Sequence, residues 1–279
     1  MFESIDLSPR AGSEIRADRA GLLNGDYSKK IEKLLVERSA LVFRELFLTD
    51  EEQLQFAKSI GKVVPLGEDG VSKISLDPTV SSSADYTRGA FFWHIDGAND
   101  ALPAKATMLT AKMLSDEGGD TLICNTYAAY EDLPETEKKA LEGVKIRHAL
   151  EATQRLVHPQ PTAKELERWR TRPSQTHPLV WQHKHGSNSL LLGATCLYVH
   201  DMSPEDSSML LCRLQDWATQ DRYVYRHKWK VGDFLLWDNT GTMHRATPYD
   251  IASGRRLHRF TLDGEEPITA TKQEQALSA

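Results

Sequence analysis

The sequence predicts a mainly β protein with decorating helices, arranged as a double-stranded β-helix (jelly roll) of two facing sheets. Short apolar or alternating runs bounded by turn residues recur along the chain, which is typical of this architecture. They do not alternate regularly with helices, as parallel α/β folds require. With 279 residues, the chain is expected to form a single domain over 1–279, because β-sandwiches and barrels often reach this size undivided.

Each element is predicted from apolar periodicity and turn chemistry. Helices are expected where apolar residues recur every three to four positions, and strands where they alternate or form short runs. Thr49 and Glu52 form a capping-box signature for one helix, which ends at Gly61. The predicted helices are 27–38, 49–61, 127–133, 134–141, 163–170 and one from 203 with Met209, Leu210, Leu214 and Trp217 facing inward. The predicted strands are 40–44, 92–96, 107–113, 121–124, 178–183, 189–193, 223–229, 234–237 and 255–262.

Three stretches are expected to lack regular structure. Residues 67–88 are rich in Ser, Asp and Gly and are expected to form a loop, placed where a substrate lid would be useful. Residues 184–188 join two predicted strands as a hairpin. The polar tail 270–279 is expected to be frayed.

Composition limits the possible partners and the compartment. A net charge of −6 argues against general attraction to nucleic acid or anionic membranes, so an anionic ligand needs a local basic pocket. Three widely spaced cysteines, Cys124, Cys196 and Cys212, fit free thiols in a reducing compartment. The N-terminus lacks the pattern of a secretory signal, and no apolar run approaches the roughly 20 residues of a membrane-spanning helix. We therefore expect a cytoplasmic protein.

A His-x-Asp pair and a distant histidine form the main candidate site. His94 and Asp96 lie two residues apart in a predicted strand and so point to the same side. With His244 they supply two imidazoles and one carboxylate, a set that can occupy one face of an octahedral Fe(II) and leave the other face open. An isolated H-x-D in a chain with ten histidines is weak evidence. Aromatic residues before His94 and the later His244 strengthen it, and together they indicate an oxygenase.

Two arginines provide a second candidate feature. Arg255 and Arg259 share a face of the last predicted strand, so both guanidiniums can point into one pocket. A guanidinium binds a carboxylate in a bidentate manner. A solvated basic edge strand explains the same pattern equally well from composition, because Arg256 and His258 lie alongside.

Several motifs in order resemble one enzyme family. They are Phe92-Trp93-His94-Ile95-Asp96, Gly118-Gly119-Asp120-Thr121, 128–134, 225–229, Val231-Gly232-Asp233, Trp237-Asp238-Asn239, Met243-His244-Arg245-Ala246 and 255–259. In order and spacing, the chain resembles the Fe(II)/2-oxoglutarate-dependent dioxygenases of the taurine dioxygenase and 2,4-dichlorophenoxyacetate dioxygenase (TauD/TfdA) family. The resemblance implies a cupin-like, clavaminate synthase-like jelly roll.

The resemblance also implies a role for each site residue. His94, Asp96 and His244 would be the metal ligands and catalytic residues, binding Fe(II). Arg255 and Thr121 would bind the distal carboxylate of the co-substrate 2-oxoglutarate, and Arg259 the carboxylate or sulfonate of the primary substrate. Trp237-Asp238-Asn239 would support the last ligand strand. Tyr198 and His200 lie where relatives carry pocket residues, but the local sequence differs too much to transfer a role.

The implied reaction uses O₂ to hydroxylate a small organic acid and releases succinate and CO₂. The product then breaks down if the hydroxylated carbon bears an ether oxygen or a sulfonate. Asp96 argues against a halogenase, because halide needs the coordination position that this carboxylate fills. Desaturation, a non-catalytic cupin-like binding protein and a Zn²⁺ hydrolase are the alternatives. Relatives in the group are commonly dimers or tetramers, so a homo-oligomer is a further expectation.

Overall fold

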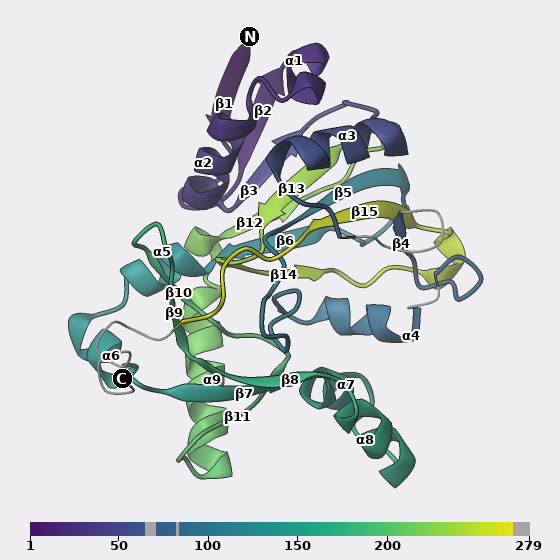
Figure 1. Ribbon diagram of the computed structural model, residues 1–279. Helices are drawn as coiled ribbons and strands as arrows, with labels where there is room; N and C mark the ends of the chain where they lie inside the picture. The colour runs from purple at the N-terminus through teal and green to yellow at the C-terminus, as the bar shows by residue number, and fades with distance from the viewer. Residues whose placement is uncertain (65–70, 82–83, 270–279) are drawn as a thin grey trace.

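Two facing sheets form the centre of the molecule. The structure, a computed structural model, describes residues 1–64, 71–81 and 84–269. The larger sheet has seven strands in the order β1-β2-β3-β13-β5-β15-β4, and the smaller one has the order β12-β6-β14. The helices α2 and α3 lie on the side of the large sheet that faces away from the small sheet (Figure 1). The predicted jelly roll with decorating helices is confirmed.

The strands of the two facing sheets have the following bounds. They are β1 (Phe2–Asp6), β2 (Ser13–Ala17), β3 (Ala40–Phe43), β4 (Ser72–Ile74), β5 (Ala106–Met113), β6 (Thr121–Asn125), β12 (Val224–His227), β13 (Phe234–Asp238), β14 (Thr242–Ala246) and β15 (Arg256–Leu262). A third sheet contains β7 (Lys145–Ala149), β8 (Ser174–Pro178) and β11 (Cys196–Val199), and the predicted hairpin is formed by β9 (Val180–Gln182) and β10 (Asn188–Leu190).

The helices surround these sheets. They are α1 (Arg19–Asn24), α2 (Ser28–Arg38), α3 (Asp50–Ile60), α4 (Ala84–Thr87), η1 (Arg88–Phe91), α5 (Thr126–Glu131), α6 (Glu135–Ala140), α7 (Leu150–Val157), α8 (Ala163–Arg170), α9 (Pro204–Ala218), η2 (Asp221–Tyr223) and η3 (Ile251–Ser253). The capping box predicted for α3 is present, with Thr49 accepting from the Glu52 backbone and Glu52 from that of Thr49. None of the helices in the described residues is long and apolar enough to cross a membrane.

Side-chain alternation along the central strands builds two layers of core. Phe234 and Leu236 of β13 pack outward under α2 and α3, while Leu235 and Trp237 pack inward between the two sheets. Because both faces are buried, the strand reads as a continuous apolar run and not as an alternating one. A third cluster, which includes Trp93, joins the ligand-bearing segment to the third sheet and α9. The metal-motif segment is therefore held between two layers.

Several sequence predictions need correction. Met209 of α9 is 71% exposed and does not face inward, whereas Leu214 is buried as predicted. Neighbouring positions of a helix differ by about 100° in direction, so Met209 and Leu210 cannot both lie at the centre of the packed face. The stretch 67–88 is not wholly loop, since it contains β4 and α4 and meets η1; its residues 67–70 and 82–83 lie outside the described residues. The tail 270–279 also lies outside them.

Candidate metal centre and active site

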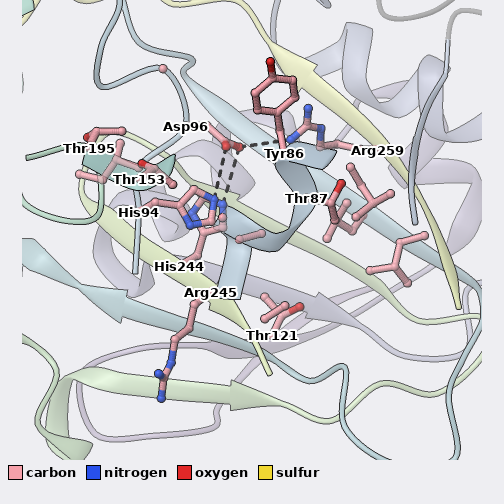
Figure 2. A pocket seen from close by; sticks show the side chains of 18 of the residues that line it. Tyr86, Thr87, His94, Asp96, Thr121, Thr153, Thr195, His244, Arg245 and Arg259 are labelled. Atoms are coloured by element: carbon pink, nitrogen blue, oxygen red, sulfur yellow. Dashed lines mark ion pairs between the residues drawn. The ribbon is translucent and has the colours of Figure 1, made fainter. Parts of the chain in front are cut away.

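Two imidazoles and one carboxylate converge at the mouth of the sandwich. The Nε2 atoms of His94 and His244 each lie 3.7 Å from a different carboxylate oxygen of Asp96. The potential ligand atoms of the three residues all lie within 4.8 Å of one another. Figure 2 shows the two rings and the carboxylate turned toward one point. This spacing suits three bonds of about 2 Å to one metal ion.

The backbone around His94 differs from the predicted strand. Residues 92–96 do not form a strand; His94 alone makes an isolated antiparallel bridge, with N–H···O distances to and from His244 of 3.0 and 2.8 Å. The Phe92 N–H bonds back to Gly89, and Asp96 begins a turn, so the ladder cannot extend. The prediction of a strand was wrong, although the single bridge still sets the two histidines side by side.

Asn239 holds the turn that carries Asp96. Its Oδ1 accepts from the Asp96 N–H at 3.0 Å, and its Nδ2 donates to the carbonyls of Asp96 and Ala104 at 2.7 and 3.1 Å. The side chain is fully buried. Thr107 donates to Asp96 Oδ2 at 3.1 Å. The sequence predicted that Asn239 supports the last ligand strand, whereas its side-chain bonds hold the Asp96 turn. Nothing in the sequence marked Thr107, which is an ordinary β-branched strand residue.

The protonation states suit metal binding. The Phe92 carbonyl accepts from His94 Nδ1 at 2.9 Å, which leaves the Nε2 lone pair free. Burial, aided by the neighbouring His94, lowers the pKa of His244 to about 3 and so keeps it neutral. Burial raises the pKa of Asp96, but His244, Arg259 and His94 outweigh it, so the value is about 2. A neutral imidazole at His244 and a carboxylate anion at Asp96 are therefore presented together, with Nε2 of His94 turned toward the same point.

A buried arginine lies at one end of the pocket. Arg255 is 2% exposed, and its Nη2 donates to the Gly119 carbonyl at 2.7 Å. Its guanidinium carbon lies 4.5 Å from the centre of the Tyr249 ring. Gly119 has φ +74°, and a Cβ there would lie 2.5 Å from Arg255 Nε, so the Gly-Gly turn leaves room for the arginine. Nε has no partner among the described residues, which suits an anionic ligand.

Thr121 lies in the same pocket wall. The indole of Trp229 donates to its Oγ1 at 3.0 Å, so the hydroxyl proton is left to donate to a ligand. Arg259 lies on the other side, with Nη1 3.7 Å from Asp96 Oδ2. The pocket, of about 300 Å³, is lined by all six predicted site residues: His94, Asp96, Thr121, His244, Arg255 and Arg259. Tyr198 and His200 are not among the described residues that line it.

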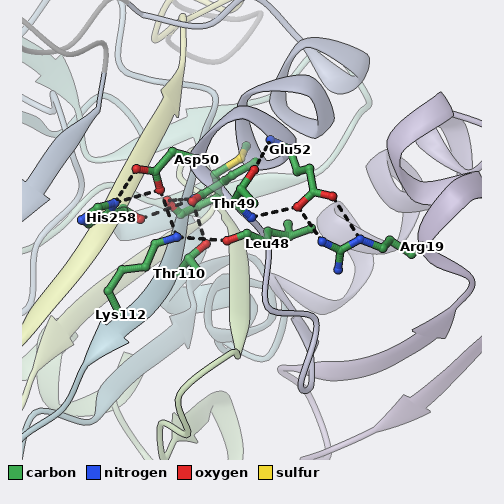
Figure 3. A network of polar contacts seen from close by, with 10 residues as sticks. Arg19, Leu48, Thr49, Asp50, Glu52, Thr110, Lys112 and His258 are labelled. Carbon is green, nitrogen blue, oxygen red and sulfur yellow. Dashed lines mark hydrogen bonds and ion pairs between the residues drawn. The ribbon is translucent and has the colours of Figure 1, made fainter.

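A polar network on the outer face fixes the strand that carries Arg259. His258 Nδ1 lies 2.8 Å from Asp50 Oδ1 of α3, and Lys112 of β5 lies 3.0 Å from the same oxygen (Figure 3). Thr110 donates to the buried Gln53 at 2.6 Å. These contacts tie α3 to β5 and β15. The alternative prediction, that 255–262 is a solvated basic edge strand, is therefore wrong. The inner face of this strand lines the pocket, and α3 covers its outer face.

The comparisons with known proteins agree with this geometry. A family model described as "Taurine catabolism dioxygenase TauD, TfdA family" matches residues 3–261. An alpha-ketoglutarate-dependent 2,4-dichlorophenoxyacetate dioxygenase of Cupriavidus pinatubonensis is 34% identical, covering 93% of this chain and 92% of the relative. An alpha-ketoglutarate-dependent sulfate ester dioxygenase of Pseudomonas putida is 30% identical, covering 95% and 91%.

One solved structure resembles this protein over nearly the whole length of both chains. The crystal structure of AAD-2 in complex with Mn(II) and N-oxalylglycine superposes with a TM-score of 0.83 at 27% identity, covering 96% of this chain and all of AAD-2. The family match spans both facing sheets and every residue of the pocket described above. The chain therefore belongs to the TauD/TfdA dioxygenase family.

Proposed function

We propose that this protein is an Fe(II)- and 2-oxoglutarate-dependent dioxygenase that hydroxylates a small organic acid. The observation that carries the proposal is the convergence of His94, Asp96 and His244 at one point of a pocket that also contains a buried arginine. These three residues would hold the iron and be its catalytic ligands. When bound, iron with 2-oxoglutarate and O₂ supplies the oxidising power, releasing succinate and CO₂ as the substrate C–H bond is hydroxylated.

Arg255 and Thr121 would anchor 2-oxoglutarate. The guanidinium already donates one N–H to Gly119 and keeps further N–H groups for the distal carboxylate of the co-substrate. The Thr121 hydroxyl would add a second donor, because its oxygen is occupied by the Trp229 indole. Burial strengthens this charge-assisted contact and excludes water from the end of the pocket.

Arg259 would bind the acid group of the primary substrate. Its guanidinium lies beside Asp96, so an acid held there keeps the adjoining carbon near the metal ligands. Asp96 offsets part of the arginine charge in the absence of substrate. The named relatives act on a phenoxyacetate and on sulfate esters, and we propose a carboxylate, sulfonate or sulfate of similar size for this protein. A different oxidative reaction, such as desaturation of the substrate, would use the same residues.

Domain organisation, compartment and assembly extend the proposal. The large sheet joins β1 near the N-terminus to β15, and the site residues come from 94 to 259, which supports one domain. Cys124, Cys196 and Cys212 are all free thiols, which supports a reducing, cytoplasmic setting. A homo-oligomer stays a prediction.

Succinate release tests the proposed activity. The iron-loaded protein would be incubated aerobically with 2-oxoglutarate and a panel of aryloxyacetates, alkyl sulfates and alkyl sulfonates. Substrate-dependent succinate formation, lost in His94→Ala, is the expected result. The control is His200→Ala, which removes an imidazole outside the pocket lining and is expected to keep activity. A protein that releases no succinate with any member of the panel, or whose activity survives in His94→Ala, would contradict the proposal.

A further inference from the structure

A second cavity adjoins the metal pocket. It has a volume of about 480 Å³, and it shares two lining residues, Tyr86 of α4 and Gln154 of α7, with the first. The side chains of these two residues therefore form a common wall. The wall is packed tightly behind them, since a Cβ on Gly89 of η1 would lie only 2.8 Å from the Thr153 methyl group. The two cavities therefore meet at Tyr86 and Gln154.

Two arginines and one carboxylate line the second cavity. Arg88 and Arg168 line it, and after the hydrogen bonds from Thr162 the charge of Arg168 helps to lower the pKa of the nearby Glu165 carboxyl. Glu165 lines it as well, but its Oε2 accepts from the backbone N–H and the hydroxyl of Thr162, both at 2.8 Å, as part of the α8 capping box. Arg172 does not line this cavity, but its guanidinium carbon lies 5.9 Å from the centre of the Tyr86 ring in the cavity wall. Two guanidiniums against one carboxylate leave a small excess of positive charge among the described lining residues, in a chain whose net charge is −6.

An unpartnered amide lies in the shared wall. Gln154 is only 2% exposed, and its Nε2 is buried with no hydrogen-bond partner among the described residues. Buried side-chain amides are nearly always hydrogen-bonded in native proteins, so one left unpaired at a cavity wall points to a ligand. Gln154 lines both cavities, so this amide is accessible to a ligand that occupies either of them.

We propose that the second cavity is an anion-binding subsite of the same active site. The substrate class is then an elongated organic dianion. One acid group lies at Arg259 beside the metal ligands, the other lies between Arg88 and Arg168, and the connecting part passes the amide of Gln154. This assignment rests on the proposed function, because it takes the metal pocket as the place of reaction.

Binding of matched monoanions and dianions tests the subsite. Under anaerobic conditions the protein with Fe(II) and 2-oxoglutarate would be titrated with phenoxyacetate, 4-carboxyphenoxyacetate and 3-carboxyphenoxyacetate. Binding would be followed by the change in the visible absorption of the iron chelate. We expect the better dianion to bind at least about tenfold more tightly than phenoxyacetate, a factor that corresponds to about 1.4 kcal/mol.

Variants separate the subsite from general charge effects. In Arg88→Ala/Arg168→Ala the preference for the dianion should fall below about threefold, with the phenoxyacetate Kd unchanged. Arg16→Ala/Arg213→Ala is the matched control, since it removes the same charge from exposed positions on β2 and α9. Gln154→Leu, which keeps the volume and removes the amide, should also weaken the dianion.

The outcomes are distinct. Equal affinities in the parent protein, or a dianion preference that survives in Arg88→Ala/Arg168→Ala, would overturn the subsite. An unchanged dianion Kd in Gln154→Leu would show that the Gln154 amide is not part of the subsite. Absence of the iron chelate absorption in the parent protein would instead overturn the proposed function, on which the subsite depends.

Discussion

Asn239 is expected to support both the fold and the metal site, and Asn239→Ala measures how much. The side chain is fully buried and makes three hydrogen bonds of 2.7–3.1 Å, two of them to the backbone of Asp96. At about 1 kcal/mol for each bond, the variant should lose about 3 kcal/mol of unfolding free energy in the metal-free protein. The Asp96 turn would then be free to move, and loss of such support typically weakens metal affinity about 10- to 100-fold.

Two measurements check this prediction. Urea unfolding of the metal-free protein gives the change in stability, and Mn(II) titration gives the change in metal affinity. Asn24→Ala is the matched control, because Asn24 is exposed at the end of α1 and should change stability by less than about 0.5 kcal/mol. An Asn239→Ala protein that is within about 1 kcal/mol of the parent and binds Mn(II) equally well would refute the reasoning.

Three further predictions concern the co-substrate, the metal and pH. Arg255→Lys keeps the charge but loses the planar fork and one of its contacts, so the Kd of 2-oxoglutarate should rise about tenfold or more in equilibrium titration; an unchanged Kd would exclude the proposed anchor. Asp96→Ala should open a metal coordination position and remove most hydroxylation, measured as product formed with a substrate; full activity would contradict the ligand role. Burial lowers the pKa of His148 to about 3 from 6.5, so the unfolded chain takes up the proton first. The contribution of His148 to the free energy of unfolding is therefore complete above pH 6.5. As the pH decreases from 6.5, it should decrease by up to about 1.4 kcal/mol per pH unit. Urea midpoints at pH 7 and 5.5, with His148→Asn as the comparison, measure that slope; an equal slope in both proteins would be evidence against it.

The site residues were predictable because their signals are local or ordered along the chain. His94 and Asp96 form a short motif, and Arg255 and Arg259 share a strand face whatever the rest of the fold does. The contacts that place them were not predictable. Thr107 hydrogen-bonds to Asp96, more than ten positions away in the sequence. Trp229 hydrogen-bonds to Thr121, more than 100 positions away. No periodic pattern encodes such pairings.

The fold was predicted best where strands are buried. The run 234–237 of β13 is apolar on both faces and was predicted directly. The N-terminal strands β1 and β2 were missed, since β1 (Phe2–Asp6) has no buried residue and its polar side chains hide the alternation. Helix α7 was missed as well, because Glu151, Thr153 and Gln154 are polar residues that become buried only through tertiary packing.

The segment 92–96 shows how local pattern and tertiary structure differ. Its aromatic and alternating residues are typical of a strand, yet only His94 pairs. The Gly193 region explains part of this arrangement, since a Cβ on Gly193 would lie 2.8 Å from the Trp93 carbonyl. The Ala194 N–H then bonds that carbonyl at 2.7 Å. Backbone from a distant segment thus takes the place of a neighbouring strand.

Anaerobic titration of the Fe(II)-loaded protein with 2-oxoglutarate is the most direct test of the central claim that His94, Asp96, His244 and Arg255 form one cofactor site. The account predicts a visible charge-transfer band in the parent protein. The band should be absent in His94→Ala, and in Arg255→Ala it should need far more 2-oxoglutarate. A folded, iron-replete parent protein without the band, or a band that is unaffected by both substitutions, would contradict the account.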